Sequence, residues 1–440
     1  MTKTYFIITF GCQMNKNDSE RIASFFEKIG YKMAAKIEDA NFILVNMCSV
    51  RQSAVDRVYG IINKIEKLKK INPKIKTILT GCILNEDKNK LKNKFDFILN
   101  IQTLPKWKNI ILKNKNFYQK IKDIKKESCE YFKIKPKYSN NFSAFVPISN
   151  GCNNFCSYCV VPFTRGKLIC RNWKEIKKEV EDLVKNNFKE IWLLGQNVND
   201  YQFKDVNFAK LLKIINNIEG NFWIRFTSPH PKNFTKELIF QMAKAEKVTP
   251  YLNLPIQSGD DEILKKMHRF YTQKEYENLV KEIRKAFKKY RKGLEKEVSI
   301  STDVIVGFPG ETEKQFQNTV KIFKKIKFDM AYIAKFSKRS QTLAWKLKDD
   351  VSQKEKEKRY NILTNILKKT AKEKNKIFFK KEVDVLVDKV KKENSWFWCY
   401  GKSRHYKTCK FKCKENLLGN FVKIKIESVN SFGLFGKITK

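Results

Sequence analysis

The sequence predicts an α/β protein of three parts: an N-terminal doubly wound α/β domain, a central partial (β/α)6 barrel and a small C-terminal β-barrel. Three observations support this fold class. Strand-like and helix-like stretches alternate at the N-terminus, six more strand-like runs each precede a helix-length stretch, and the last segment loses the helical period. We place the three domains at residues 1–118, 138–370 and 376–440.

The N-terminal domain is expected to be a sheet with helices on both faces. Its helical stretches include residues 19–29 and 53–70. Its strands are predicted at 5–10, 42–46, 77–80 and 95–99. Residues 110–138 are Lys-rich and weakly patterned, and we expect a linker or variable excursion there.

The central domain has six β/α units, fewer than the eight of a closed barrel, which predicts an open barrel. The predicted strands are 145–148, 191–194, 223–226, 252–256, 299–306 and 330–336. Polar signatures follow most of these strands, and sites in such folds lie at the carboxyl ends of strands. A charged helix over 351–374 is expected to connect this barrel to the last segment, whose strands include 383–387 and 422–426.

Charge and hydropathy limit the class of protein. The net charge of +45 favours a polyanionic partner such as nucleic acid, although A/T-biased codon usage would also enrich Lys. No run approaches the ~20 apolar residues of a membrane span, and the N-terminus lacks a signal-peptide cleavage site. We therefore expect a cytoplasmic protein without membrane contact. Its 11 cysteines should be reduced, so metal binding outranks disulfides.

Cys152, Cys156 and Cys159 have the spacing C-x3-C-x2-C, which can direct three sulfurs at one centre. Thiolates select iron–sulfur clusters, zinc or copper(I). Three thiolates leave one iron of a four-iron cluster open, as in catalytic metal sites. The alternative is structural zinc with a distant fourth ligand. It is disfavoured because the chain has only 3 His and no second C-x2-C pair.

Cys12, Cys48 and Cys82 each lie just past the carboxyl end of a predicted strand. If these strands are neighbours, the three thiols converge on one edge of the sheet. An ordinary buried thiol is the better interpretation for any one of them, but three equivalent positions favour a ligand set. The other cysteines are interpreted as incidental: Cys129, Cys170, Cys399, Cys409 and Cys413.

Glycine turns after two predicted strands, at Gly195-Gln196 and at Gly307 to Glu311, would let a small cofactor approach the backbone. Each signal is weak alone. His230 follows another strand, where a hydrogen-bonded loop histidine and an acid–base group are both open interpretations.

Lys402 and Arg404 lie among aromatic residues of the C-terminal segment. Basic groups beside stacking aromatics suit RNA. The alternative is a barrel core whose lysines face water.

Five stretches resemble the methylthiotransferases of the radical S-adenosylmethionine superfamily, and the resemblance spans nearly the whole chain. They are residues 9–15, 151–156, 160–166, 225–231 and 254–259. Gln-Met-Asn directly after Cys12 most resembles the members that act on isopentenyl-adenosine in tRNA. Members that act on a ribosomal protein or on threonylcarbamoyl-adenosine usually carry other residues there.

The resemblance implies two [4Fe-4S] clusters. Cys152, Cys156 and Cys159 would hold the cluster that binds S-adenosylmethionine and yields a 5′-deoxyadenosyl radical. The other triad would hold an auxiliary cluster that carries or delivers sulfur. One S-adenosylmethionine would methylate this sulfur. The radical from a second would abstract hydrogen from carbon 2 of the adenine, which then takes the methylthio group.

The resemblance also implies binding residues and partners. The residues expected to contact S-adenosylmethionine are Gly195, Gln196, Gly307 and Glu311. The last segment resembles a TRAM domain, an RNA-binding β-barrel, in which Lys402 and Arg404 would contact tRNA. An external electron donor is implied and a sulfur donor is possible, and no side chain beyond the clusters is assigned to catalysis.

Three positions depart from the family pattern, at Asn253, His268 and Cys170, and none is a predicted cluster ligand. Two competing functions stay open at this point. One is methylthiolation of a ribosomal protein or of threonylcarbamoyl-adenosine in tRNA. The other, from a different class, is a zinc-stabilised RNA-binding protein without catalysis.

Overall fold

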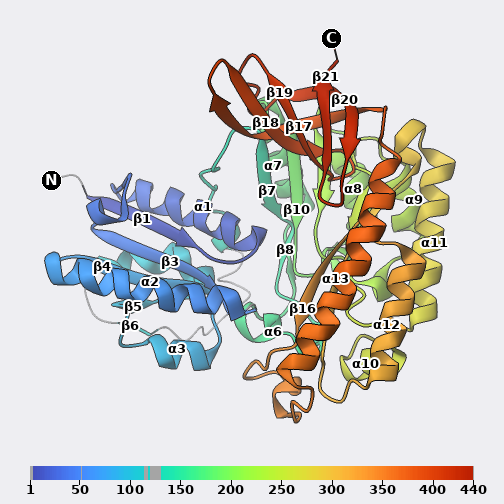
Figure 1. The fold of residues 1–440 in the computed structure, drawn as a ribbon. Helices are drawn as coiled ribbons and strands as arrows, with labels where there is room; N and C mark the ends of the chain where they lie inside the picture. Colours follow the sequence, from blue (N-terminus) through green and yellow to red (C-terminus); the bar gives the residue numbers. More distant parts are fainter. Residues whose placement is uncertain (1–2, 51, 113–116, 119–129, 440) are drawn as a thin grey trace.

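The computed structural model describes residues 3–50, 52–112, 117–118 and 130–439. Figure 1 shows an N-terminal sheet with its helices, a central barrel beside it, and a C-terminal barrel that sits against the end of the central one. The three-part α/β architecture predicted from the sequence is confirmed.

The N-terminal sheet is parallel, with strand order β2-β1-β3-β4-β5-β6. Its strands are β1 (Thr4–Thr9), β2 (Lys32–Met33), β3 (Phe42–Cys48), β4 (Lys76–Cys82), β5 (Phe97–Ile98) and β6 (Phe117–Tyr118). Its helices are α1 (Gln13–Lys28), α2 (Gln52–Ile71), α3 (Asn85–Leu91) and α4 (Trp107–Leu112). From β1 the chain adds β2 on one side and then β3 on the other, so the order of the strands reverses between β1 and β3. Ligands of doubly wound folds bind at such a switch point.

Helices cover both faces of this sheet. Successive β3 side chains point to opposite faces, so Leu44 packs with Phe26 of α1, whereas Val45 packs with Val58 of α2. These two cores confirm the doubly wound prediction.

The predicted linker over 110–138 is wrong for much of its described part. β6 pairs with β5, and Tyr131 and Phe132 are buried in the core beside Trp107. A short apolar pair among lysines has no periodicity, so its burial was not visible in the sequence. Residues 119–129, and Cys129 with them, lie outside the described residues.

The central barrel has six parallel strands in two sheets, β7-β10-β13 and β14-β15-β16, joined by a bridge between Ile224 and Val248. The strands are β7 (Ser143–Pro147), β10 (Glu190–Leu194), β13 (Trp223–Phe226), β14 (Tyr251–Asn253), β15 (Ser299–Val306) and β16 (Met330–Lys335). The helices between them are α6 (Val161–Thr164), α7 (Trp173–Lys185), α8 (Phe208–Asn216), α9 (Lys236–Lys244), α10 (Asp261–Lys266), α11 (Gln273–Tyr290) and α12 (Glu313–Ile326). Two short antiparallel strand pairs complete the domain, β8 (Ser149–Asn150) with β9 (Ile169–Cys170) and β11 (Gln202–Phe203) with β12 (Val206–Asn207).

Neighbouring elements cover the open edges of this barrel, as exposed edge strands invite unwanted pairing. Helix α1 lies along β7, where Asn17 Nδ2 donates to the Phe145 carbonyl over 2.8 Å. The long helix α13 (Gln353–Lys376) packs against β16. The N-terminal domain is therefore docked directly on the opening of the central barrel.

The C-terminal strands close into a barrel of order β17-β18-β19-β21-β20. They are β17 (Glu382–Glu393), β18 (Trp396–Ser403), β19 (Thr408–Cys413), β20 (Phe421–Val429) and β21 (Leu434–Ile438). Cys399, Cys409 and Cys413 are buried in the interior of this barrel, away from both predicted triads. No helix among the described residues is long and apolar enough to cross a membrane.

Candidate active site

Cys12, Cys48 and Cys82 lie at one edge of the N-terminal sheet, at its switch point. Cys48 and Cys82 are cross-strand partners and the final residues of β3 and β4. The sequence predicts strands that end at 46 and 80 with the cysteines just beyond them, which is wrong by two residues because each strand runs to its cysteine. Cys12 follows β1 and is the N-cap residue of α1. The predicted convergence of strand ends is therefore present in the fold.

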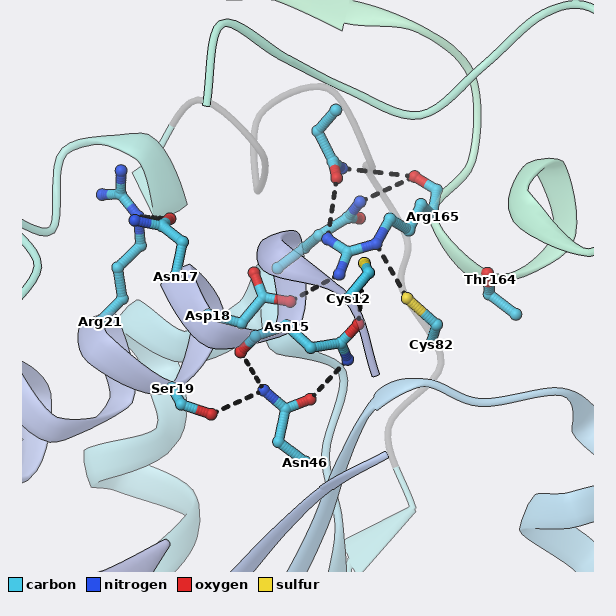
Figure 2. Close-up of polar contacts among 12 residues, drawn as sticks. Cys12, Asn15, Asn17, Asp18, Ser19, Arg21, Asn46, Cys82, Thr164 and Arg165 are labelled. Atoms are coloured by element: carbon cyan, nitrogen blue, oxygen red, sulfur yellow. Dashed lines mark hydrogen bonds and ion pairs between the residues drawn. The ribbon is translucent and has the colours of Figure 1, made fainter. Parts of the chain in front are cut away.

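A reciprocal amide pair holds the start of α1 against β3 (Figure 2). Asn15 Nδ2 donates to Asn46 Oδ1 over 2.9 Å, and Asn46 Nδ2 donates to the Asn15 carbonyl over 2.8 Å. The Cys12 thiol donates to Asn15 Oδ1 over 3.4 Å. Gly11 has φ +146°, and a Cβ there would lie 2.6 Å from Asn15 Oδ1. This turn therefore requires glycine beside the asparagine.

A buried arginine from the central domain reaches into this edge. Arg165 Nε donates to Cys82 Sγ over 2.9 Å, and its Nη2 pairs with Asp18 Oδ2 at 2.5 Å (Figure 2). The Tyr131 hydroxyl donates to the other Asp18 oxygen over 2.5 Å. Burial works to lower the pKa of Arg165, but the Asp18 and Cys82 charges outweigh it and raise this pKa. The guanidinium is therefore a fixed positive charge beside the triad.

The thiols at this edge are unequal. A hydrogen bond with Cys82 lowers the pKa of Cys48, and the same bond, with burial, raises the pKa of Cys82 well above its usual value. Burial also raises the pKa of Cys12. Metal ligation needs thiolates, so loading this triad would release protons.

The second triad lies on the loop after β8. Gly151 begins this loop with φ +83°, and a Cβ there would lie 2.1 Å from the Lys167 carbonyl oxygen. Gln196 Oε1 accepts a hydrogen bond from the Gly151 amide over 2.6 Å. The Cys159 amide donates to the Cys156 carbonyl over 2.9 Å, which turns the loop tightly. Gln196 thus holds the cysteine loop by a hydrogen bond to its first residue. The sequence predicted only a cofactor contact for Gln196.

This loop also has an arginine beside one sulfur. Arg269 Nη1 lies 3.7 Å from Cys156 Sγ, while its other nitrogens bind the Pro255 carbonyl and the Tyr271 hydroxyl. Burial raises the pKa of Cys152, and it raises that of Cys159 to about 12. Each triad therefore has one buried arginine beside one of its sulfurs.

The donor set fits two clusters in its chemistry, because each triad offers three thiols and one cationic donor. No three His, Cys, Asp or Glu side chains in the described ranges are grouped as a ligand set for one metal ion. The six cysteines thus stay a predicted ligand set, supported by where the chain places them.

Buried polar atoms without partners mark the neighbourhood of the second triad. Ser149 Oγ and Asn197 Nδ2 are buried and make no hydrogen bond among the described residues. A Cβ on Gly195 would lie 2.7 Å from this Ser149 oxygen, so the absent side chain keeps the space open. Unpaired buried groups are costly unless a ligand or water satisfies them. They fit a polar cofactor such as S-adenosylmethionine.

Gly307 and Glu311 form a turn at the carboxyl end of β15. Glu311 Oε2 accepts from the Gly307 amide over 2.6 Å and pairs with Arg359 of α13 at 2.8 Å. Between them, Phe308 packs in one cluster with Tyr158 of the cysteine loop. Glu311 thus holds the turn that places Phe308 in one cluster with the cysteine loop. Its carboxylate already binds the Gly307 amide and Arg359.

His230 is a hydrogen-bonded loop histidine. Its Nδ1 accepts from the Lys232 amide over 3.2 Å, and burial lowers its pKa to about 3. These contacts favour the structural interpretation of His230 over acid–base chemistry.

Lys402 and Arg404 lie where the C-terminal barrel meets the central one. Arg404 pairs with Glu295 and donates to the Glu246 carbonyl over 2.5 Å. Lys402 Nζ donates to Thr408 Oγ1 over 2.7 Å, and burial lowers its pKa. The structure therefore places Arg404 in contacts that dock the barrel, whereas the Lys402 contact lies within the barrel, between β18 and β19.

Sequence reasoning missed Asp18, Arg165 and Arg225, which join the domains, and Arg269, which lies beside Cys156 within the central domain. Arg165 lies in the stretch 160–166, which resembles the family, but the sequence assigned no role to this arginine. In a chain with 91 Lys and Arg, no local pattern separates a buried arginine from an exposed one.

The partial barrel with its cysteine loop defines a radical S-adenosylmethionine protein. Residues 146–323 match the model of the Radical SAM superfamily, and residues 4–101 match that of the Uncharacterized protein family UPF0004. The structure is also similar to the methyltransferase TsrM from Kitasatospora setae, whose structure holds cobalamin and a [4Fe-4S] cluster. The TM-score is 0.55 at 13% identity, over 78% of this chain and 77% of that one. At this identity the likeness concerns the fold alone.

Sequence relatives give a narrower assignment. The chain is 40% identical to the tRNA-2-methylthio-N(6)-dimethylallyladenosine synthase of Clostridium novyi (strain NT), over 99% of this chain and 96% of the relative. It is 37% identical to the enzyme of that name from Caldicellulosiruptor saccharolyticus, over 99% and 92%. The chain belongs to the family of tRNA-2-methylthio-N(6)-dimethylallyladenosine synthases.

Proposed function

We propose that this chain methylthiolates carbon 2 of isopentenyl-adenosine (N(6)-dimethylallyladenosine) next to the anticodon of tRNA. The full-length similarity to synthases of this name carries the proposal. Asn15 of the Gln-Met-Asn motif holds Cys12 in place, which gives that motif a physical role at the site. The ribosomal-protein and threonylcarbamoyl-adenosine alternatives have no such observation in their favour.

Cys152, Cys156 and Cys159 are proposed to hold the cluster that binds S-adenosylmethionine, and the other triad to hold the auxiliary cluster. When bound, these groups supply the radical for hydrogen abstraction and the methylthio sulfur, chemistry that no side-chain base provides at an aromatic C–H. The protein orients them and shields two thiols of the auxiliary triad from water, whereas Cys12 is exposed. Cys48 and Cys82 are each only 4% exposed.

We propose a S-adenosylmethionine pocket between the cysteine loop and the ends of β10 and β15. Ser149 and Asn197 have unpaired buried atoms that can bind the cofactor, and Gly195 leaves room for it. Gln196 fixes the cysteine loop. The turn between Gly307 and Glu311 packs Phe308 in one cluster with Tyr158 of the cysteine loop, which closes one side of this pocket.

The RNA contact is proposed for the outer face of β18 and β19. Lys410 Nζ lies 4.0 Å from the centroid of the Trp398 ring, and Lys412 Nζ lies 4.7 Å from it. Trp396 is 44% exposed on the same face. Exposed aromatics stack on bases and lysines bind phosphates. In this proposal Arg404 supports RNA binding by holding the barrel in place, and Lys402 supports it by joining β18 to β19.

Nucleoside mass spectrometry of tRNA from a strain that lacks the chain tests the function. Isopentenyl-adenosine should accumulate without its methylthio group, and the wild-type gene should restore the modification. Unchanged methylthio nucleoside in the deletion strain would remove the proposed role. A cytoplasmic location, an external electron donor and a sulfur donor belong to the same proposal.

A further inference from the structure

Arg165 connects the two cysteine triads through one buried side chain. It lies six residues after Cys159 in the sequence, yet its Nε binds Cys82 Sγ of the other triad. Its Nη1 binds Asn150 Oδ1 over 3.2 Å, and its Nη2 binds Asp18. One guanidinium thus joins the N-terminal sheet, helix α1 and strand β8, which leads directly into the loop that carries the second triad.

We propose that Arg165 is a positioning residue that fixes the auxiliary triad against the S-adenosylmethionine triad and raises the reduction potential of the auxiliary cluster. The proposal rests on the cluster assignment of the proposed function, and adds to it a residue with a defined electrostatic effect.

The backbone of Arg165 is anchored as firmly as its side chain. Its amide donates to the Val161 carbonyl over 2.8 Å, which ends α6. Its carbonyl accepts from Gln102 Nε2 of the N-terminal domain over 2.8 Å. Because the backbone and the guanidinium of Arg165 are both held by hydrogen bonds, a displacement of the cysteine loop would be transmitted to Cys82. The spacing of the two triads is thus set by contacts and not by chain length.

The charge of Arg165 acts at short range in a dry environment. The residue is 3% exposed, so water screens it little. Hydrogen bonds to ligand sulfurs and nearby positive charge stabilise the more negative, reduced form of a cluster and raise its potential. Asp18 is 0% exposed and partly offsets this charge. Arg165 and Asp18 should therefore shift the potential in opposite directions.

The test measures the auxiliary cluster alone, in a full-length chain with Cys152, Cys156 and Cys159 changed to Ala. Redox titration followed by electron paramagnetic resonance gives its midpoint potential. Arg165→Gln should lower the potential, because the positive donor is lost. Asp18→Asn should raise it, because the offsetting charge is lost. Opposite shifts from two substitutions in one salt bridge do not arise from general loss of structure.

Two further variants control the result. Arg165→Lys keeps the charge without the fork that reaches Cys82, Asn150 and Asp18 together, so it should lower the potential less than Arg165→Gln. Arg269→Gln removes a buried arginine beside the other triad and should leave the auxiliary potential unchanged. If Arg165→Gln and Asp18→Asn leave the potential unmoved, or shift it in the same direction, the proposal for Arg165 is wrong. A parent that binds no cluster at the auxiliary triad overturns the cluster assignment and this proposal together.

Discussion

Asn15 and Asn46 bind each other reciprocally, so that the first turn of α1 is locked to the end of β3. Both residues are 0% exposed. Cys12 and Cys48 lie on the two elements that this pair joins. The amide pair therefore sets the distance between two predicted ligands of one cluster.

Asn15→Ala should destabilise the N-terminal domain and loosen its triad. It leaves Asn46 Oδ1 without its donor in a buried site, which costs about 1–3 kcal/mol, while Asn46 Nδ2 keeps the backbone carbonyl of residue 15. Chemical denaturation of the metal-free protein measures this loss, and iron analysis measures retention at the triad. Asn217→Ala, at an exposed helix end, is the matched control. An unchanged denaturation midpoint would show that the pair does not stabilise the domain.

Iron content should separate the two triads. The reconstituted protein is expected to hold about eight irons, and the triple Ala variant of either triad about four. The Cys12, Cys48, Cys82 variant should still cleave S-adenosylmethionine, because the second triad is intact. The Cys399, Cys409, Cys413 triple Ala variant controls for thiol loss, since those cysteines fill a barrel core. Full iron in either triad variant would contradict the assignment.

Arg225 should be needed to dock the C-terminal barrel. Its guanidinium pairs with Glu190 at 2.6 Å and donates to the carbonyls of Ser403 and Arg404. Arg225→Met leaves a buried carboxylate unpaired, which costs about 3–5 kcal/mol. Adding Glu190→Gln should recover part of this loss. Thermal unfolding of the full chain measures both, and equal losses in the two variants would argue against an uncompensated charge.

Trp398→Ala and Lys410→Gln should weaken tRNA binding without changing cluster content. Loss of one stacked base is worth about 1–3 kcal/mol, and loss of one phosphate contact should flatten the salt dependence of binding by about one unit. Filter binding across a salt series measures both effects. Lys437→Gln, an exposed lysine on β21, is the control. Wild-type affinity for both variants would exclude this face.

His405 should make stability fall in mild acid. Burial lowers its pKa to about 3 in the folded chain, against about 6.5 when unfolded. The unfolded state therefore binds more protons between these values, so stability is full above pH 6.5 and is lost as the pH falls. The loss between pH 7 and pH 5 is about 2 kcal/mol.

Urea unfolding at both pH values measures this loss. His405→Gln should reduce the pH dependence of the free energy of unfolding by about one proton. An unreduced pH dependence in His405→Gln would contradict the prediction.

Much of the fold followed from local patterns. The strands 223–226 and 299–306 were predicted with the bounds that β13 and β15 have, because buried parallel strands are continuous apolar runs. The C-x3-C-x2-C spacing needed no neighbours to be recognised. Tyr131 and Phe132 were missed because burial of an isolated apolar pair depends on distant elements.

The sequence by itself determined the three-part α/β architecture, the six candidate cysteines and the strand 422–426, which lies within β20. Only the tertiary structure decided which partners the side chains of these segments contact. Lys402 and Trp398 both lie on the outer face of β18 and are both partly buried, but Lys402 binds Thr408 of β19, whereas the Trp398 ring lies beside Lys410 and Lys412. The docking of the first two domains likewise brings Arg165 to Cys82. Periodicity and spacing act over a few residues, whereas burial and charge pairing are set by segments that meet only after folding.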